Sequence, residues 1–398
     1  MYNRYPKAKV ILDLEILLAK MIRRQYKDRL SSHAGFSLGV LMDYQMMQKR
    51  RYRYFVRDHF DSFTVRNDMK LEYLLDYTKS IAGGESRPAM KLKRLDRVCA
   101  WAQVNHMHIH GHVLVYHQNV PEEFFHEGYD AGKPVASREV LLERLKYYIQ
   151  SMITHFEEKY PGVINCWDVV NEPIGEASDE YDANDPDHIR THREGVPNLY
   201  LKYIGRDYVE KAFLYAREAA DALHADIRLY LNEYNTFSVG KLPYILKLAN
   251  RINTSVKDEN GEYRKLCDGI GMQGYIGLPG RQEGCLNRNV IGRIRDAICT
   301  YADNGLETAI TELTVRNYDP AKTEEHRQYT EELFRMFMEV NRTGRGDLRS
   351  VTVWGISDVP CTDEYNEYHW NSHGGLLDEQ YRPKDVFRSI QKLLTGVH

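Results

Sequence analysis

The sequence has neither a long hydrophobic run nor a strong excess of charge of one sign. No stretch approaches the roughly 18 consecutive apolar residues of a membrane-spanning helix. The first 30 residues also lack the apolar core and small-residue cleavage site of a signal peptide. Lys and Arg total 54 against 57 Asp and Glu, which predicts no basic surface for nucleic acid. We therefore expect neither a membrane nor a nucleic-acid partner. The compartment stays open between the cytoplasm and secretion after removal of a leader.

Metal-ribbon motifs and interdomain linkers are also missing. The six cysteines form no CxxC pair, so a zinc ribbon or a thioredoxin-like redox site is not expected. No tract rich in Pro, Gly and Ser separates the chain into domains. What is present is a globular composition, 42% hydrophobic and 28% charged, which excludes disorder. Tyr, at 29 residues, outnumbers Phe and Trp together, and its apolar face with a polar tip suits ring-shaped polar ligands such as sugars.

Short apolar runs alternate with longer charged helical patterns along the chain. The apolar runs predict eight strands, at residues 35–41, 60–66, 107–115, 164–171, 228–234, 268–276, 307–313 and 350–357. The helical patterns lie at residues 42–58, 90–105, 137–158, 206–223, 241–252, 288–303, 323–342 and 384–394. This alternation is typical of βα units around a parallel sheet. It predicts an α/β fold, a single (β/α)8 TIM barrel over residues 31–398, with an N-terminal helical arm over residues 1–30.

A doubly wound two-domain fold is the alternative architecture. It is disfavoured because no GxGxxG motif opens a helix after an early strand. The barrel also indicates where function lies, since chemistry in this fold collects at the C-terminal ends of the strands.

Two predicted strands end in a glutamate. The fourth ends in WDVVNEP, which contains Glu172, and the seventh ends in ITELT, which contains Glu312. Strands four and seven face each other across an eight-stranded ring, so the two carboxyl groups are expected to approach. A retaining glycosidase needs two carboxyl groups roughly 5 Å apart. One attacks the anomeric carbon, and the other protonates the leaving oxygen and then deprotonates water.

These two motifs resemble the catalytic signatures of family 10 glycoside hydrolases, whose activity is endo-1,4-β-xylanase (EC 3.2.1.8). Further segments resemble other strands of that family in chain order: FDSFTVRNDMK at 60–70, GHVLVYH at 111–117, LYLNEYN at 229–235, DGIGMQGY at 268–275, VTVWGISD at 351–358 and LLDEQYRPK at 376–384. The resemblance covers nearly the whole chain. It implies a barrel that cleaves β-1,4-linked xylan or xylo-oligosaccharides through a covalent glycosyl-enzyme intermediate, with no cofactor and no metal, and we expect it to act as a monomer.

The resemblance also implies roles for individual residues. Glu172 takes the acid/base role and Glu312 the nucleophile role, while Asn171 is placed to bond the sugar 2-hydroxyl, an interaction that strengthens in the transition state. The other positions that it assigns to substrate binding are Asn67, Lys70, His112, Gln273 and Trp354.

The chain departs from the family pattern on the sugar-binding side. The departures are Arg66 for Glu, Tyr116 for Trp, Asn119 for Gln, Tyr275 for His, and Thr362 for a second Trp that Trp370 would have to replace. Arg66 changes an acceptor into a cation with five donors. We therefore expect the non-reducing side to admit decorated or uronate-bearing chains. At position 275 a phenol can still donate to the nucleophile, so we expect activity with a changed pH profile.

Two other functions stay open. His106, His108, His110 and His112 alternate in MHIHGH, and period-two spacing predicts that all four share one face of a strand. An HxH pair of this kind binds zinc in some barrel hydrolases, which gives a metal-dependent amide or ester hydrolase as an alternative. The later strand ends offer few imidazoles for such a site. The second alternative is a carbohydrate-binding barrel that has lost catalysis, and the presence of both glutamates argues against this hypothesis.

The nucleophile assignment predicts the outcome of one substitution. Glu312→Ala should abolish turnover and leave the fold intact, because it removes the attacking carboxylate. Turnover of xylo-oligosaccharides and the circular dichroism of the variant are the measurements. Residual activity above a few per cent in a folded variant would contradict the assignment.

Overall fold

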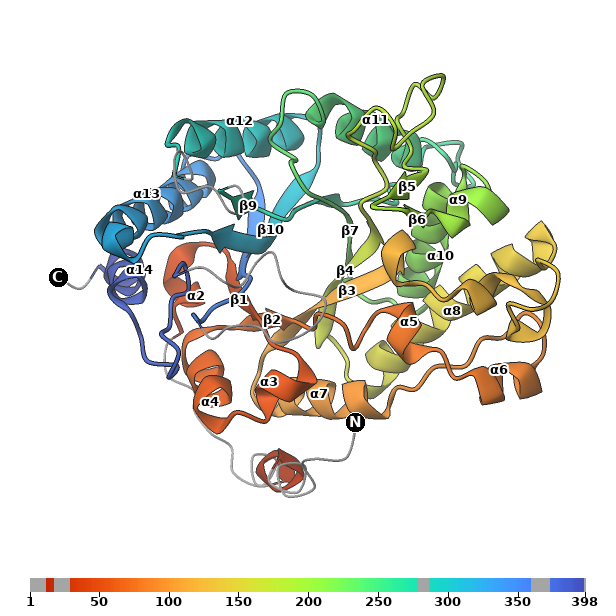
Figure 1. The fold of residues 1–398 in the computed structure, drawn as a ribbon, viewed down its shortest axis with the longest axis horizontal. Coiled ribbons are helices and arrows are strands. Elements are labelled where there is room, and N and C mark those ends of the chain that lie inside the picture. Colours follow the sequence, from red (N-terminus) through yellow and green to blue (C-terminus); the bar gives the residue numbers. More distant parts are fainter. Residues whose placement is uncertain (1–11, 18–28, 278–285, 359–372, 397–398) are drawn as a thin grey trace. The chain divides into compact units, whose positions relative to one another are not determined.

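The structure is a computed structural model, and it describes residues 12–17, 29–277, 286–358 and 373–396. The parallel strands pair in the order β11-β1-β2-β3-β4-β7-β8-β10, and β10 pairs in addition with β11, which closes the sheet. The barrel strands are β1 Ser37–Leu41, β2 Ser62–Thr64, β3 His108–Tyr116, β4 Ile164–Asn171, β7 Arg228–Glu233, β8 Gly269–Met272, β10 Glu307–Val315 and β11 Leu348–Val353. The predicted (β/α)8 barrel is confirmed (Figure 1).

Helices follow the strands at nearly all the predicted places. The helices are α2 Ser31–Ala34, α3 Tyr44–Met47, α4 Arg50–His59, α5 Leu71–Leu74, α6 Tyr77–Gly83, α7 Lys93–Val104, α8 Arg138–Lys159, α9 Leu199–Tyr203, α10 Tyr208–Ala222, α11 Leu242–Asn253, α12 Asn289–Asp303, α13 Thr323–Arg342 and α14 Asp385–Thr395. Short 3-10 helices accompany them among the described residues: η1 His117–Asn119, η2 Glu122–Phe125, η3 Glu127–Tyr129 and η4 Pro320–Lys322. No helix of the described residues is both long and apolar enough to cross a membrane.

The chain divides into two compact units that are interleaved in sequence. The first contains residues 65–233 and 243–269 and is built on β3, β4 and β7. Its helices α8 and α10 pack on each other, and α10 also packs on β4 (Figure 1). Ser137 caps the N-terminus of α8 by accepting from the Val140 amide, at the boundary that the helical pattern predicts.

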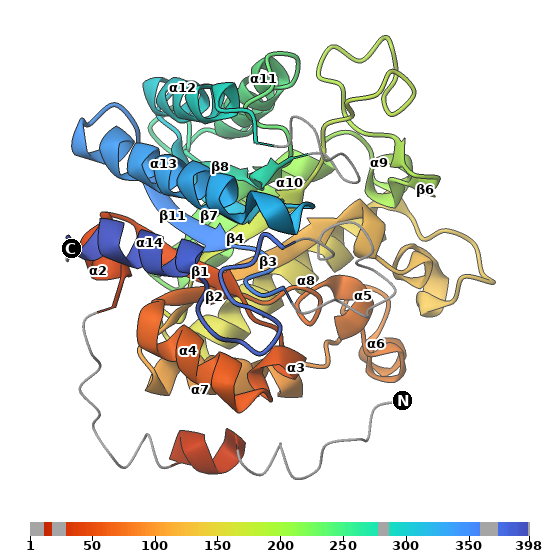
Figure 2. The same ribbon diagram turned by 60° about the vertical axis from the view of Figure 1, so that its left-hand side comes forward.

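The second unit contains residues 22–64, 234–242 and 270–398. Its strands β2, β1, β11 and β10 pair in parallel, and the short β9 (Tyr275–Ile276) adds to β10. Every residue of β10 is buried, as expected for a parallel strand covered on both faces. Helices α13 and α14 lie side by side in this unit (Figure 2).

Two predicted elements are interrupted in the structure. The helix expected at 42–58 is two helices, because Asp43 caps α3 and the chain becomes extended at Lys49 before α4 begins. The strand expected at 268–276 is divided into β8 and β9, with Gly274 between them in the left-handed region. Within the predicted N-terminal arm, residues 12–17 are helical, and Asp13 forms an ion pair of 3.3 Å with Arg97 of α7. Thr362 and Trp370 lie outside the described residues.

The close approach of β3 and β4 requires a glycine. Gly111 pairs with Trp167, and a Cβ at position 111 would lie 2.3 Å from the indole ring of that buried tryptophan. Gly111→Ala should therefore lower the free energy of unfolding by about 1–3 kcal/mol through overpacking. Denaturant unfolding measures the change. The control is Gly292→Ala on α12, where nothing lies within 4 Å and helix propensity predicts a gain of about 0.5–1 kcal/mol. Equal stability of Gly111→Ala and the native chain would contradict the packing argument.

Candidate active site

Glu172 is the first residue after β4, and the backbone places its carboxylate in a buried polar setting. Its φ of 53° lies in the left-handed region, and its amide donates to the Asn232 carbonyl at 2.9 Å. The residue as a whole is 5% exposed. Its Oε2 lies 3.2 Å from the Tyr116 hydroxyl, whose proton is shared with Gln118 Oε1 at 2.5 Å, and forms an ion pair with Nη1 of Arg193. The structure thus brings Tyr116, one of the departures from the family pattern, into direct contact with the predicted acid/base.

Asn171, beside Glu172, is held by an asparagine from the neighbouring strand. The Asn232 amide Nδ2 donates to Asn171 Oδ1 at 2.8 Å, and both side chains are buried. This bond fixes which end of the Asn171 amide carries the donor, as the predicted contact with a sugar hydroxyl requires.

His112 belongs to a buried cluster centred on Asp168 of β4. One Asp168 oxygen bonds His110 Nε2 and the other bonds His112 Nδ1, each at 2.8 Å. Burial by itself would lower the pKa of His110, but the Asp168 carboxylate outweighs it and raises that pKa well above its usual value. Burial likewise opposes ionisation of Asp168, yet the two imidazoles lower its pKa. The cluster therefore carries an ion pair between His110 and Asp168, and the same carboxylate orients His112.

The strand-three histidines do not form the row that period-two spacing predicts. His106 precedes β3, with a φ of 49°, and His108 is exposed and bonds the Gly162 carbonyl at 3.0 Å. The prediction that all four histidines share one strand face is wrong, because β3 begins only at His108. Among the described residues, no group of three or more His, Cys, Asp or Glu is arranged to hold a metal.

The other predicted binding residues of this unit have different surroundings. Lys70 Nζ lies 5.5 Å from the centre of the Tyr116 ring, within cation–π distance. Arg66 is buried and Asn67 is half-buried, next to the end of β2. Asn119 donates to Glu72 Oε2 at 2.8 Å, so its amide is engaged by a protein carboxylate.

Glu312 lies within β10 and is 5% exposed. The Tyr275 hydroxyl of β9 donates to its Oε2, the bond expected if a phenol takes the place of an imidazole. Gln273 is buried between β8 and β9. A hydrogen bond to the carboxylate favours its charged form, which suits a nucleophile.

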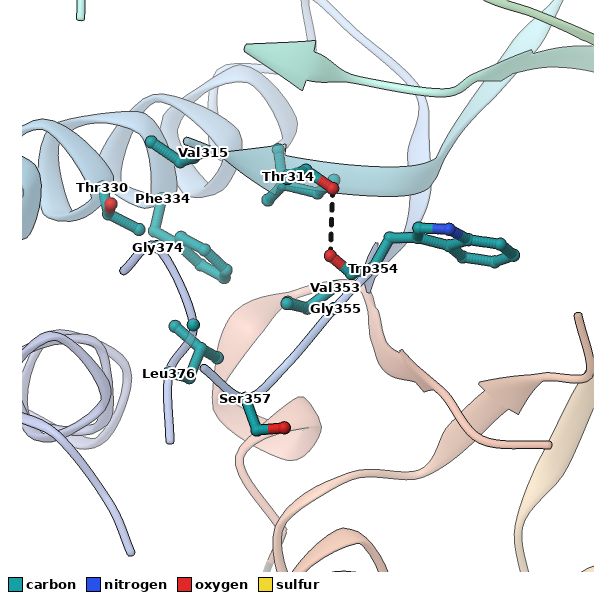
Figure 3. A pocket seen from close by; sticks show the side chains of 12 residues that line it. Thr314, Val315, Thr330, Phe334, Val353, Trp354, Gly355, Ser357, Gly374 and Leu376 are labelled. Atoms are coloured by element: carbon teal, nitrogen blue, oxygen red, sulfur yellow. Dashed lines mark hydrogen bonds between the residues drawn. The ribbon is translucent and has the colours of Figure 1, made fainter. Parts of the chain in front are cut away.

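Trp354 follows β11 and is buried with Leu41, against the half-buried Tyr275 and Met46. Its amide donates to the Leu313 carbonyl at 2.8 Å, and its carbonyl accepts from Thr314 Oγ1 at 2.9 Å. Figure 3 shows the indole directed away from a small pocket lined by Phe334, Leu376 and neighbouring residues. That pocket therefore belongs to the packing around β10 and α13, whereas Trp354 packs against Tyr275, whose hydroxyl donates to Glu312.

Three residues that bear on the site were missed by the sequence analysis. Asp168 lies in the WDVVNEP motif, where its burial beside two histidines could have been suspected from the strand pattern. Glu233 accepts from the Ile174 amide at 2.8 Å and so holds the backbone just beyond Glu172. Arg193 had only a weak local signal, the Glu-Gly turn that follows it, and its pairing with Glu172 arises from tertiary structure.

A parallel (β/α)8 barrel that carries one buried glutamate after its fourth strand and another on its seventh is typical of retaining glycoside hydrolases. The model of glycosyl hydrolase family 10 matches residues 27–393. The chain belongs to glycosyl hydrolase family 10.

Individual relatives agree with this membership. A Caldicellulosiruptor saccharolyticus protein assigned as an endo-1,4-beta-xylanase is 31% identical over 331 residues, which is 81% of this chain and 96% of that protein. Endo-1,4-beta-xylanase B of Butyrivibrio fibrisolvens is 29% identical over 81% of this chain, and the chain spans only 46% of its length. The fold is shared with the Clostridium thermocellum endo-1,4-beta-D-xylanase 10B, solved with xylohexaose, at a TM-score of 0.76 and 23% identity, over 92% of this chain and 67% of that one.

The Asp168 cluster predicts a stability loss that depends on pH. Asp168→Asn should lower the free energy of unfolding by about 3–5 kcal/mol near pH 5.5, because it leaves His110 buried without its counter-ion. The raised pKa of His110 contributes stability that is complete below about pH 6.5 and is lost as pH rises through the folded value. The lowered pKa of Asp168 contributes stability above about pH 3.9 that is lost on acidification. The deficit should therefore be largest between these limits and shrink towards pH 9.

Urea unfolding at pH 5.5 and pH 9 tests this dependence. Asp296→Asn on the exposed face of α12 is the control, and it should change stability by less than about 0.5 kcal/mol at either pH. A deficit of Asp168→Asn that is the same at both pH values would rule out the ion pair.

Proposed function

We propose that the protein is a retaining endo-1,4-β-xylanase that cleaves β-1,4-linked xylan or xylo-oligosaccharides. The observation that carries the proposal is the pair of buried glutamates, Glu172 directly after β4 and Glu312 on β10, each within hydrogen-bond distance of a tyrosine hydroxyl in a chain of family 10. Relatives named as endo-1,4-beta-xylanases support the substrate class. We keep the expectation that the enzyme acts as a monomer as part of the proposal.

In the first step, Glu312 attacks the anomeric carbon while Glu172 gives its proton to the glycosidic oxygen, and the bond between that carbon and oxygen breaks. The covalent intermediate links the sugar to Glu312. In the second step, Glu172, now a carboxylate, takes a proton from water, whose oxygen attacks the same carbon and releases Glu312. Two inversions at one carbon retain its configuration.

The neighbours of each glutamate fit these roles. The hydroxyl of Tyr275 stabilises the Glu312 carboxylate before attack. Asn171, fixed by Asn232, is placed to bond the sugar 2-hydroxyl as positive charge develops on the ring. His112, whose Nδ1 is held by Asp168, leaves Nε2 for a hydroxyl of the sugar that carries the cleaved bond, and Lys70, beside the Tyr116 ring, supplies a donor.

We further propose that the preferred chains carry acidic or bulky substituents. Arg66 is a buried cation at the end of β2, where a family carboxylate would accept from sugar hydroxyls. A guanidinium has only donors, and it pairs well with a carboxylate such as that of a uronosyl branch. Tyr116 in place of a tryptophan leaves more space on the same side.

One experiment tests both parts of the proposal. Plain, arabinosylated and glucuronosylated xylans are digested, the products are separated, and the anomeric configuration of the newly released ends is followed by NMR. We expect xylo-oligosaccharides whose new reducing ends first appear as the β-anomer, with glucuronosylated chains cut most efficiently. Release of the α-anomer first, or no cleavage of any xylan, would contradict the proposed function.

The role of Arg66 is tested separately by Arg66→Glu. The substitution should lower the ratio of activity on acidic chains to activity on plain chains by roughly tenfold, so that plain chains become the preferred substrate. This is the effect expected when a charge-assisted bidentate contact is lost. Arg293→Glu reverses the charge of an exposed arginine on α12 and should leave the preference unchanged. If Arg66→Glu leaves the ratio of acidic to plain substrate unchanged, the acidic preference is wrong, although xylanase activity would still stand.

A further inference from the structure

The long connection after β4 carries an arginine to the predicted acid/base. Arg193 forms an ion pair with Oε2 of Glu172, and its side chain is 26% exposed against 7% for the glutamate. No residue of the family signatures predicts this contact, because Arg193 lies 21 residues beyond Glu172 in an acidic loop.

Local structure holds Arg193 in place. It is the last residue of β5 (His192–Arg193), which forms a two-residue hairpin with β6 (Val196–Pro197). Glu194 and Gly195 make the turn with φ of 51° and 80°, the left-handed pair of a tight hairpin. Strand β6 packs on η1, which follows β3 and so lies next to Tyr116. The hairpin therefore presents the guanidinium from a short, constrained element.

The base of the loop is fixed to the backbone around Glu172. Arg190 donates from Nε to the Glu172 carbonyl at 2.9 Å and from Nη2 to the Ile174 carbonyl at 2.6 Å. Its third contact is an ion pair of 2.6 Å with Glu180. Arg190 thus ties the loop to the backbone of the acid/base, while Arg193 reaches the carboxylate itself.

Several other titratable or charged groups face Glu172. The Tyr116 hydroxyl faces it from β3, and His117 faces it from η1. Burial lowers the pKa of His117 to about 3. The nearby Glu172 opposes this shift, whereas the charges of Arg190 and Arg193 add to it. His117 is therefore neutral. From the loop come Arg190, whose guanidinium binds backbone carbonyls, and Glu180, which is paired with it. Glu233 at the end of β7 binds the Ile174 amide.

We propose that Arg193 is a positioning residue that holds the Glu172 side chain. It also sets the upper pH limit at which Glu172 keeps its proton for catalysis. The inference rests on the proposed function. A guanidinium at contact distance favours the carboxylate over the carboxylic acid. It therefore limits the fraction of enzyme that is ready to donate a proton, but it stabilises the negative charge that appears on Glu172 as the proton moves to the leaving oxygen. In the second step the same contact opposes proton uptake from water.

The test is the pH dependence of kcat/KM for xylotetraose in the native enzyme and in Arg193→Gln. The alkaline limb reports loss of the proton from the free enzyme's acid. Removal of the cation should move this limb to higher pH by about one unit, since an opposite charge lowers a carboxyl pKa by about 1–3 units. Arg193→Lys keeps the charge and should retain most of the native limb.

A second substrate separates positioning from a merely structural role. The dinitrophenolate of 2,4-dinitrophenyl β-xylobioside leaves without protonation, so its kcat/KM should show no shift of the alkaline limb in Arg193→Gln. Asp179→Asn removes an exposed carboxylate of the same loop and is the matched control, with the native limb expected for both substrates. Thermal melting confirms that each variant is folded.

The outcomes are distinct. An unchanged alkaline limb in Arg193→Gln, or an equal loss of kcat/KM with both substrates at every pH, overturns the role of Arg193. Failure of the native enzyme to cleave xylotetraose or the aryl xylobioside overturns the proposed function itself.

Discussion

Buried carboxylates dominate the physical chemistry of this protein. A carboxylate removed from water costs several kcal/mol unless donors replace the lost hydration. Each of the three central carboxylates has such donors: Asp168 has two imidazoles, Glu172 has a phenol and a guanidinium, and Glu312 has a phenol. The surrounding strands supply these partners in fixed positions, because a parallel sheet brings residues that are distant in sequence to the same strand ends.

The two proposed catalytic carboxylates differ in the charge of their partners. Glu312 is bonded to a neutral hydroxyl, which favours the ionised state that a nucleophile needs. Glu172 is next to a cation as well as a hydroxyl, although a general acid must hold a proton. The guanidinium of Arg193 therefore links the pH range of the enzyme to one hairpin of the loop after β4.

Two substitutions of the family pattern act through direct contacts with these carboxylates. Tyr116 and Tyr275 stand where the resemblance expects Trp and His, and the hydroxyl of each lies within hydrogen-bond distance of one glutamate. A departure that looked like a loss of binding surface is thus also a change in the hydrogen bonding of the reacting groups. Asn119 is different, since its amide is engaged by Glu72.

The sequence by itself determined the barrel and most of the helix and strand positions. It also placed the two glutamates at the fourth and seventh barrel strands, because hydrophobic periodicity and strand motifs are local signals. It also anticipated that Tyr275 would donate to Glu312. Only the tertiary structure decided which histidines belong to β3, how His110 and His112 share Asp168, and that Arg193 reaches Glu172. Those contacts join residues 21 to 58 positions apart, and no local periodicity encodes which side chains meet across such separations.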